Sequence, residues 1–357
     1  MSINPYHGLD DFHFWRKAMT DVAPGQIDIV RRSALIEPQH QLATLGSCFA
    51  QHIARHIMAS GLHHFDVEPA PPGMPAEQAH TQGYGVFSAR YGNVYTVRQA
   101  LQLFDRAFGT FKPQEAVWAH DGRYVDAFRP AIEPGGWAHP DDVLAQAEQH
   151  LACVRQMFCS FDWLVFTLGL TEAWRSRLDG AVYPLAPGLA GGSFDALRHE
   201  FVNFSARQVS ADLNELVTKI ASVNPQGRIL LTVSPVPLVA TYENQHVWVA
   251  STVSKARLRV AADEAEQANA QVMYFPSYEV ITSPAAGGRY YADDLRQVTE
   301  AGIKHVMRLF SRHFMQASPS TPIASNMEQD LKRAQLYSDV VCEEELIAAS
   351  LGNLLTL

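Results

Sequence analysis

Two adjacent residues, Ser47 and Cys48, stand where a predicted strand turns into a predicted helix. Residues 42–45 are short and apolar, as in a buried strand, and Gly46 marks the turn. Between residues 49 and 57 apolar side chains recur every four positions, which predicts a helix that ends at about Ala59. Either the Ser47 hydroxyl or the Cys48 thiol could therefore act as a nucleophile.

A helix N-terminus suits this chemistry for two physical reasons. Its first backbone N–H groups have no partner within the helix, and the helix dipole is positive there. Such a site lowers the pKa of a thiol, and the same N–H groups can hold a developing oxyanion. The alternative is a buried structural Cys48 with Ser47 as a cap, since free cysteines are among the most buried residues.

Two further segments carry residues that could bind a ligand. The apolar run at residues 161–168 is typical of a central parallel strand, and polar Thr171 and Glu172 follow it. Open α/β sheets bind ligands at the carboxyl ends of their strands. Residues 84–95 contain glycines that let backbone approach a ligand closely, although an ordinary hairpin or loop explains them equally well.

Composition excludes several classes of function. The chain has 357 residues, is 47% hydrophobic and 18% charged, and can bury a large core. A formal charge of −9 and the lack of any Lys/Arg run argue against nucleic-acid and anionic-membrane partners. The start of the sequence lacks the features of a signal peptide, and no stretch approaches about 18 apolar residues. We therefore expect a cytoplasmic protein.

The cysteines form no recognisable framework. Four in so long a chain predict reduced thiols, and their spacing gives no zinc motif. We expect neither a metal nor another cofactor. The four residues are Cys48, Cys153, Cys159 and Cys342.

Strand and helix patterns alternate along most of the chain. Helices are predicted over residues 95–108, 140–158, 206–223, 249–267 and 303–314, and strands over 228–234 and 272–275. Thr299 and Glu300 stand where a cap and an acid would be wanted for the last of these helices. The alternation predicts a parallel sheet with helices on both faces.

One domain is expected over residues 1–317. Its first 40 residues form an N-terminal arm, whose Phe12, Phe14 and Trp15 are predicted to pack on the core. Insertions at 110–137 and 183–204 would form the wall of a pocket, and residues 318–357 a linker and a C-terminal helical tail. The insertions carry aromatic rings that could stack on a sugar or an acyl carrier: Trp118, Tyr124, Trp137 and Tyr183.

Residues 46–50 spell Gly-Ser-Cys-Phe-Ala, the motif that names the GSCFA family. The chain from about Pro5 to Phe314 resembles this family, which belongs with the SGNH/GDSL hydrolases. Further similar signatures follow in the expected order at residues 167–174, 232–238, 254–255 and 274–279. The resemblance implies a flavodoxin-like three-layer α/β sandwich and, by analogy, acyl-ester chemistry.

The resemblance also assigns roles to single residues. The Gly-Asp-Ser of the first SGNH block falls on residues 46–48, so the nucleophile position is Cys48. Gly92, with Asn93 beside it, matches the glycine of the second block. The third block falls on residues 169–172, a segment in which Gly169 is retained. There Thr171 takes the place of the oxyanion-hole Asn and Glu172 that of Asp.

The last SGNH block, Asp-x-x-His, falls on residues 294–297, and here the chain departs from the pattern. Asp294 is present, but Gln297 replaces the catalytic His. An amide cannot take a proton, so an unmodified Ser-His-Asp mechanism is excluded in this registration. Either Cys48 works with another base, for which we name His246, or the site has lost hydrolysis and only binds a ligand or a partner.

The sequence thus favours an SGNH-like acyl hydrolase or acyltransferase that forms an acyl thioester on Cys48. The alternative is a catalytically degenerate SGNH-fold binding module. A small molecule, a carbohydrate or an acyl carrier is the expected substrate, with no nucleic acid and no membrane as partner. The oligomeric state stays open.

Overall fold

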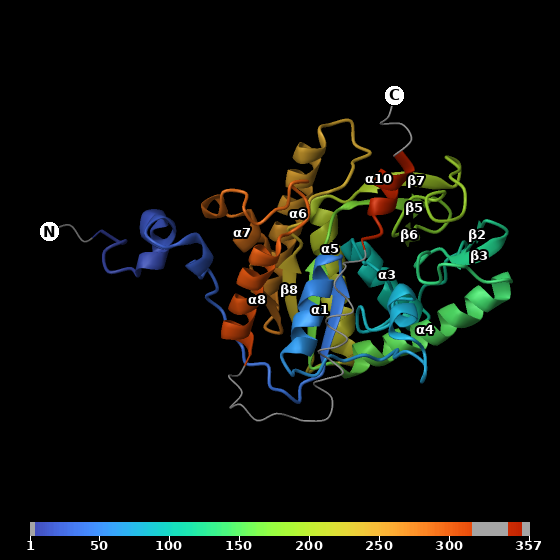
Figure 1. Ribbon diagram of the computed structural model, residues 1–357, viewed down its shortest axis with the longest axis horizontal. Helices are drawn as coiled ribbons and strands as arrows, with labels where there is room; N and C mark the ends of the chain where they lie inside the picture. The colour runs from blue at the N-terminus through green and yellow to red at the C-terminus, as the bar shows by residue number, and fades with distance from the viewer. Residues whose placement is uncertain (1–3, 316–341, 352–357) are drawn as a thin grey trace.

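A four-stranded parallel sheet forms the centre of the protein (Figure 1). The computed structural model describes residues 4–315 and 342–351. The strand order is β1-β4-β8-β9, and all three neighbouring pairs are parallel. The strands are β1 (Leu42–Gly46), β4 (Trp163–Leu168), β8 (Arg228–Val233) and β9 (Val272–Tyr274). The predicted parallel sheet is confirmed.

Helices cover both faces of this sheet. Side chains alternate along a strand, so Leu164 and Phe166 pack into one apolar core while Trp163 and Val165 pack into another. The first core is covered by α3 (Val97–Ala107), α4 (Pro140–Ser160), α5 (Ala206–Val223) and α6 (Val247–Ala268). The second is covered by α1 (Phe49–Ala59), α7 (Ser277–Thr282) and α8 (Glu300–Phe314). The flavodoxin-like three-layer fold is confirmed.

Local signals fix several helix ends. Thr96 and Ser205 each form a capping box at the start of α3 and α5, which satisfies backbone N–H groups that the helix leaves open. The Thr299 hydroxyl accepts the N–H of Gly302, so the predicted cap of α8 is confirmed. These local hydrogen bonds explain why the predicted and observed helix bounds nearly coincide.

Two small antiparallel sheets lie in and next to the insertions. One is the hairpin of β2 (Val117–His120) and β3 (Arg123–Asp126). The other has the order β6-β5-β7, with β5 (Glu172–Ser176), β6 (Val182–Tyr183) and β7 (His199–Asn203). Trp118 and Tyr183 pack together in their own buried cluster, each 1% exposed. These two rings are therefore closed to a ligand, contrary to the expectation of an aromatic pocket wall.

The N-terminal arm differs from its prediction. It contains only short helical turns, η1 (Asp11–His13), η2 (Arg16–Thr20) and η3 (Pro24–Gln26), none of which has a buried residue. Phe12 is 41% and Trp15 70% exposed, and this first part of the arm extends away from the sheet (Figure 1), whereas Val30 and Ile36 further along the arm are buried in the core. Turns this short present too little apolar surface to hold both rings against the core.

The remaining short elements are α2 (Ala76–Thr81), η4 (Pro284–Ala286) and α10 (Glu345–Leu351). Of the predicted linker and C-terminal tail over residues 318–357, residues 318–341 and 352–357 lie outside the described residues. Within the described ranges, no helix combines the length and the apolar character needed to cross a membrane.

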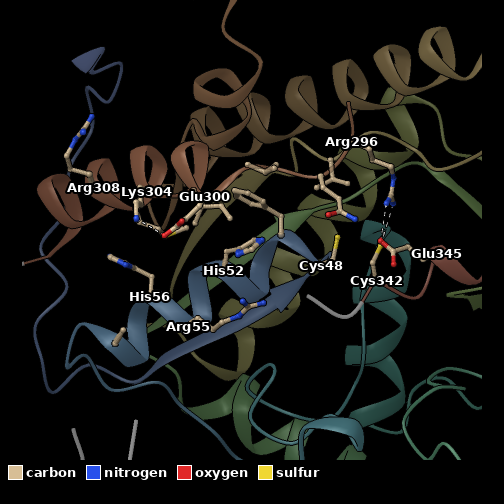
Figure 2. Close-up of a pocket in the computed structure, with 17 residues that line it drawn as sticks. Cys48, His52, Arg55, His56, Arg296, Glu300, Lys304, Arg308, Cys342 and Glu345 are labelled. Atoms are coloured by element: carbon tan, nitrogen blue, oxygen red, sulfur yellow. Dashed lines mark hydrogen bonds and ion pairs between the residues drawn. The ribbon is translucent and has the colours of Figure 1, made fainter. Parts of the chain in front are cut away.

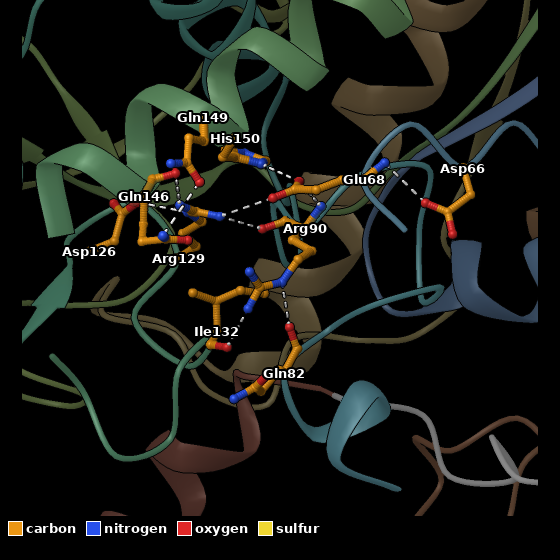
Figure 3. A network of polar contacts seen from close by, with 10 residues as sticks. All are labelled: Asp66, Glu68, Gln82, Arg90, Asp126, Arg129, Ile132, Gln146, Gln149 and His150. Carbon is orange, nitrogen blue, oxygen red and sulfur yellow. Dashed lines mark hydrogen bonds and ion pairs between the residues drawn. The ribbon is translucent and has the colours of Figure 1, made fainter. Parts of the chain in front are cut away.

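A buried polar network fastens the loop before α3 to α4 (Figure 3). Glu68 accepts the backbone N–H of Arg90 at 2.8 Å and is hydrogen bonded to Nδ1 of His150 at 2.7 Å. Arg129 donates to Asp126 at 2.7 Å and to the carbonyl oxygen of Arg90 at 3.3 Å. The loop that continues to Gly92 and Asn93 is thereby held in place beside the sheet.

Candidate active site at the carboxyl ends of the strands

The turn after β1 lies tightly against β4. Gly46 has φ +131°, and a Cβ there would stand 2.2 Å from the carbonyl oxygen of Thr167. The N–H of Ser47 donates to that same oxygen at 3.1 Å. Cys48 then occupies the N-cap position of α1, and its side chain makes no cap hydrogen bond. The predicted strand, turn and helix are observed, and the thiol lies at the carboxyl edge of the sheet.

A cavity of about 1010 Å³ opens beside the Cys48 thiol (Figure 2). Its apolar wall comes from α1 and α8, for example Phe49 and Met307. Arg296 and Gln297 line it from the segment before α8. Basic side chains from these elements outnumber acidic ones along the described wall. Cys48 itself is only 5% exposed, so something covers it.

The cover is a distant part of the chain, the segment that starts at Cys342. Cys342 and Cys48 line the same cavity, and each thiol shifts the pKa of the other. Arg296 donates to Sγ of Cys342 at 3.5 Å and to Oε2 of Glu344 at 3.2 Å. Figure 2 shows Cys48, Cys342 and Arg296 at the same end of the cavity. The C-terminal segment therefore occupies the space directly above the nucleophile position.

The next residue of this segment, Glu343, contacts Gly92 and Asn93, the residues that match the second SGNH block. Both the backbone N–H and the side chain of Asn93 donate to its carboxyl group. A Cβ on Gly92, which has φ +68°, would stand 2.8 Å from Oε1 of Glu343. Gly92 and Asn93 thus form a small site for a carboxyl group, and only glycine allows this close approach.

The two thiols have opposite pKa shifts. The hydrogen bond with Cys342 and burial raise the pKa of Cys48 well above its usual value. The same hydrogen bond, together with Arg296, lowers the pKa of Cys342 to about 6 despite burial. The expectation of a lowered pKa for Cys48 is therefore wrong in this arrangement. Burial and the neighbouring Cys342 thiolate raise the pKa by more than the helix N-terminus lowers it.

Lys255 is a buried base candidate that the sequence reasoning did not assign to the site. It projects from α6, is 4% exposed, and its Nζ donates to the carbonyl oxygen of Gly169 at 2.6 Å. It lines a cavity of about 10 Å³ together with Cys48 and Glu344. Burial lowers the pKa of Lys255 to about 8, and burial with Cys342 raises the pKa of Glu344 to about 7.

His246 does not join this group. It is exposed and caps α6, where its Nδ1 accepts the N–H of Trp248 at 3.1 Å. It lines neither cavity at Cys48. His52 does line the large cavity, but burial lowers its pKa to about 3. The structure gives His246 a local capping role.

The third block serves to connect strands and loops. Thr171 donates its N–H to Oγ of Ser254 at 3.0 Å and its hydroxyl to Asn203 at 2.7 Å. Glu172 accepts the Thr241 hydroxyl at 2.7 Å. Of this block, Gly169 lines the small cavity at Cys48, whereas Thr171 and Glu172 line neither cavity. The hydroxyl of Thr171 is therefore committed to neighbours away from the thiol.

The last block forms a turn that directs Arg296 to the site. The Asp294 carboxylate accepts the N–H groups of Arg296 and Gln297 at 3.0 and 2.9 Å. Asp294 itself is exposed, while Gln297 lines the large cavity. Asp294 thus binds the backbone of Gln297 and not its side-chain amide, and Arg296 makes the polar contacts above the thiols.

Ser47 is the remaining candidate. It is 3% exposed and lines the small cavity, and its hydroxyl oxygen has no hydrogen-bond partner within residues 4–315 and 342–351. The same described ranges contain no group of three or more His, Cys, Asp or Glu side chains arranged to hold a metal ion.

Sequence patterns could have identified some of the residues around Cys48 but not others. Lys255 lies in a signature at residues 254–255 that resembles the family, so a signal existed. Arg296 is adjacent to a residue of the last block. No local pattern links the segment at Cys342 to Cys48, because only the packing of distant segments brings them together.

The protein is thus a three-layer α/β domain built on a parallel sheet, with Cys48 at the turn between β1 and α1. The chain belongs to the GSCFA family, whose model matches residues 41–310.

Comparisons with individual known proteins give less information than the family match. A comparison with curated proteins finds no match. Two solved structures of variants of Axe2, an acetyl-xylooligosaccharide esterase from Geobacillus, are similar to the chain. Each has 16% sequence identity and a TM-score of 0.31, and the alignments cover 78% of this chain and 96% of those chains. At so low a TM-score, the fold rests on the strands and helices described above.

Proposed function

We propose that the protein is an acyl hydrolase or acyltransferase that forms an acyl thioester on Cys48. The observation that carries this proposal is the position of the thiol, at the N-terminus of α1 beside a cavity of about 1010 Å³. The N–H groups of Cys48 and Phe49 precede the first bonds of the helix, which run from Ala50 to Ser47 and from Gln51 to Cys48.

The proposed reaction begins with attack of the Cys48 sulfur on an acyl carbonyl carbon. The carbonyl oxygen becomes an oxyanion, which N–H groups of the turn and of Asn93 can stabilise. The Asn93 donors lower the pKa of Glu343 against the burial that raises it to about 8, so they favour a charged oxygen. The alcohol or thiol then leaves, and water or another hydroxyl or amine resolves the thioester.

Lys255 is the base that this reaction needs in place of the missing His. A lysine with a lowered pKa can take a proton when it is neutral, and its compact amine fits a buried site. It lies beside Cys48 in the small cavity, and its pKa is about 8. Glu344 raises that pKa, so departure of the C-terminal segment would make Lys255 a readier proton acceptor.

The substrate must displace this segment before it reaches the thiol. The cavity has a volume at the upper end of the range for small-molecule sites, and its wall is partly basic. A small molecule, a carbohydrate or an acyl carrier fits these dimensions. All four cysteines are free, which supports the reducing environment of a cytoplasmic protein.

Mass spectrometry of the intact protein, after exposure to a panel of acyl thioesters and aryl esters, tests the proposal. We expect an added acyl group that maps to the peptide containing Cys48 and is absent in Cys48→Ala. Cys159→Ala is the matched control, because Cys159 is exposed on α4 and lies outside the site. Full acylation of folded Cys48→Ala would overturn the assignment and return Ser47 to consideration.

The second candidate is a catalytically degenerate SGNH-fold binding module. Its specific support is that Asn93 and Arg296 already hold the carboxyl groups of Glu343 and Glu344. A site of this kind would bind acidic ligands without forming an adduct. Saturable ligand binding with no acylation of Cys48 by any member of the panel would favour it.

A further inference from the structure

We propose that Cys48 and Cys342 form a reversible disulfide with a hydroperoxide as oxidant, which locks the C-terminal segment across the nucleophile. The bond itself does not depend on acyl transfer. Its consequence for activity rests on the proposed function.

The first argument is geometric. The two thiols lie at one end of the same cavity and each shifts the pKa of the other, although 293 residues separate them along the chain. Both project into the same end of the large cavity (Figure 2), and both line its wall. A protein disulfide needs two cysteines that approach each other closely, and the shared end of the cavity brings these two together.

The second argument is the charge around Cys342. Arg296 donates to its sulfur at 3.5 Å, and this donor is itself held by the carbonyl oxygen of Pro237, which accepts from Nε at 3.2 Å. A guanidinium in this position favours the thiolate, the form of cysteine that reacts with peroxides. Cys342 is half-buried and Cys48 buried, so a peroxide in the cavity meets Cys342 more readily.

The chemistry then has two balanced steps. The Cys342 thiolate attacks one peroxide oxygen, so that an S–O bond forms, the O–O bond breaks and hydroxide leaves to become water with a solvent proton. The resulting sulfenic acid is attacked by the sulfur of Cys48, which loses its proton. An S–S bond forms, and the S–O bond breaks to release hydroxide, which takes that proton. Two thiols and one hydrogen peroxide thus give one disulfide and two waters.

The disulfide would keep the segment in place. Glu343 and Glu344 would remain on Asn93 and Arg296, and the nucleophile would be covered and consumed at the same time. A dithiol reductant restores both thiols by exchange. Oxidation would therefore switch the site off reversibly and protect Cys48 from irreversible oxidation.

Peptide mapping tests the bond directly. The full chain is treated with hydrogen peroxide near equimolar amounts, remaining thiols are alkylated, and a digest without reductant is analysed by mass spectrometry. We expect one cross-linked pair of peptides, containing Cys48 and Cys342, that disappears after dithiothreitol. The proposal is overturned if both residues remain fully alkylated, or if the cross-link joins other cysteines instead.

Variants separate the two steps. Cys48→Ser should leave a sulfenic acid on Cys342 that dimedone traps, and Cys342→Ser should give no cross-link. Cys159→Ser, the matched control, should cross-link as the wild type does. Arg296→Met should raise the Cys342 pKa from about 6 and so slow oxidation at pH 7, by about twofold for a rise of one unit and about tenfold for a rise of two. An unchanged rate in Arg296→Met, with folding verified by circular dichroism, would contradict the role of the guanidinium.

An activity assay on the oxidised protein distinguishes failure of this inference from failure of the proposed function. Acylation that is lost on oxidation and returns on reduction supports both. Absence of the cross-link in an active enzyme overturns the disulfide alone. A cross-linked protein with no acylation in either state supports the disulfide and counts against the acyl-transfer function.

Discussion

The Cys48 thiol illustrates how one residue responds to competing electrostatic effects. A helix N-terminus favours the thiolate, but it acts through partial charges of the backbone. Burial and the hydrogen bond to Cys342 act in the opposite direction and raise the pKa of Cys48. The thiol is consequently protonated while the C-terminal segment covers it, and it needs a nearby base to react.

Lys255→Met should slow acylation of Cys48 on the order of 10²–10⁴-fold, the usual contribution of a general base. The methionine keeps an unbranched chain and removes the amine. Because Lys255 is active only when neutral, the wild-type rate should rise with pH through the Lys255 pKa, which is about 8 with the C-terminal segment in place and lower once Glu344 has left. Stopped-flow acylation between pH 6 and about 10 measures both effects.

Lys304→Met is the control for charge alone, since Lys304 is paired with Glu300 on the outer wall of the cavity. It should keep the wild-type pH profile. If Lys255→Met also keeps that profile and rate, another group removes the proton.

At the scale of elements, the turn between β1 and α1 depends on one glycine. Gly46 combines a left-handed φ with contact against the backbone of β4. The resulting close approach places the N-terminus of α1 directly at the sheet edge. A side chain at this position would push the turn, and therefore Cys48, away from its neighbours.

Gly46→Ala should lower the free energy of unfolding by about 2–5 kcal/mol, from strain at φ +131° and a clash with Thr167. Urea unfolding followed by circular dichroism gives the value. Gly73→Ala separates the two causes, because Gly73 has φ +86° but no atom within 4 Å of an added Cβ. That variant should lose only about 1 kcal/mol. Equal losses in the two variants would show that the contact with β4 is unimportant.

The segment that starts at Cys342 is a second decisive element, because it covers the nucleophile. Glu344→Gln should weaken its attachment to Arg296, since hydrogen bonds to charged groups contribute about 1.5–3 kcal/mol. We expect iodoacetamide to alkylate Cys48 roughly tenfold or more faster in this variant. Quantitative peptide mass spectrometry follows the rate.

Ser350→Ala is the comparison for this experiment, because Ser350 is an exposed residue of α10. Its alkylation rate should match that of the wild type. If Glu344→Gln leaves the alkylation rate of Cys48 unchanged, contacts other than the Glu344–Arg296 pair hold the segment in place.

At the scale of the whole molecule, the network around Glu68 joins the loop before α3 to α4. Burial alone would raise the pKa of Glu68, but His150, the N–H of Arg90 and Arg129 together hold it at about 2. Burial and Arg129 lower the pKa of His150 to about 4, although Glu68 opposes this. At neutral pH the network therefore contains an ionised Glu68 and a neutral His150.

Glu68→Gln should destabilise the fold by about 3 kcal/mol, because it leaves buried donors without their carboxylate. Denaturant unfolding at pH 7 provides the measurement. Glu77→Gln makes the same chemical change at an exposed position on α2 and should be nearly neutral. Similar losses in both variants would contradict a special role for the network.

The same groups predict the acid limit of stability. The unfolded chain protonates His150 near pH 6.5, while the folded protein does so only near 4, so stability should fall over this interval. Glu68 is protonated near pH 4.5 in the unfolded chain and near 2 in the folded protein, which removes further stability below pH 4.5. Melting temperatures across this range should decrease less steeply in Glu68→Gln. Parallel curves would exclude Glu68 as a source of the acid sensitivity.

The sequence by itself determined the three-layer fold and the place of Cys48, for a local reason. Alternation, helical periodicity and caps such as Thr299 depend on neighbours in the chain, so they can be recognised without tertiary contacts. The parallel arrangement followed because strands and helices alternate. The exposed arm around Trp15 departed from its prediction, since apolar composition alone does not say whether a short turn finds a core.

Only the tertiary structure decided which groups surround the thiol. Motif spacing placed Thr171 in the oxyanion hole and Gln297 in the position of the catalytic His, and the lack of that His led us to name His246 as the base. Spacing along the chain, however, does not tell which side chain faces a cavity. Hydrogen bonds turned Thr171 toward Asn203 and left His246 at the start of α6. Lys255, Arg296 and Cys342 come from distant segments and meet Cys48 only after the sheet and its helices have packed. Their burial sets their pKa values, and burial is a property of the folded molecule.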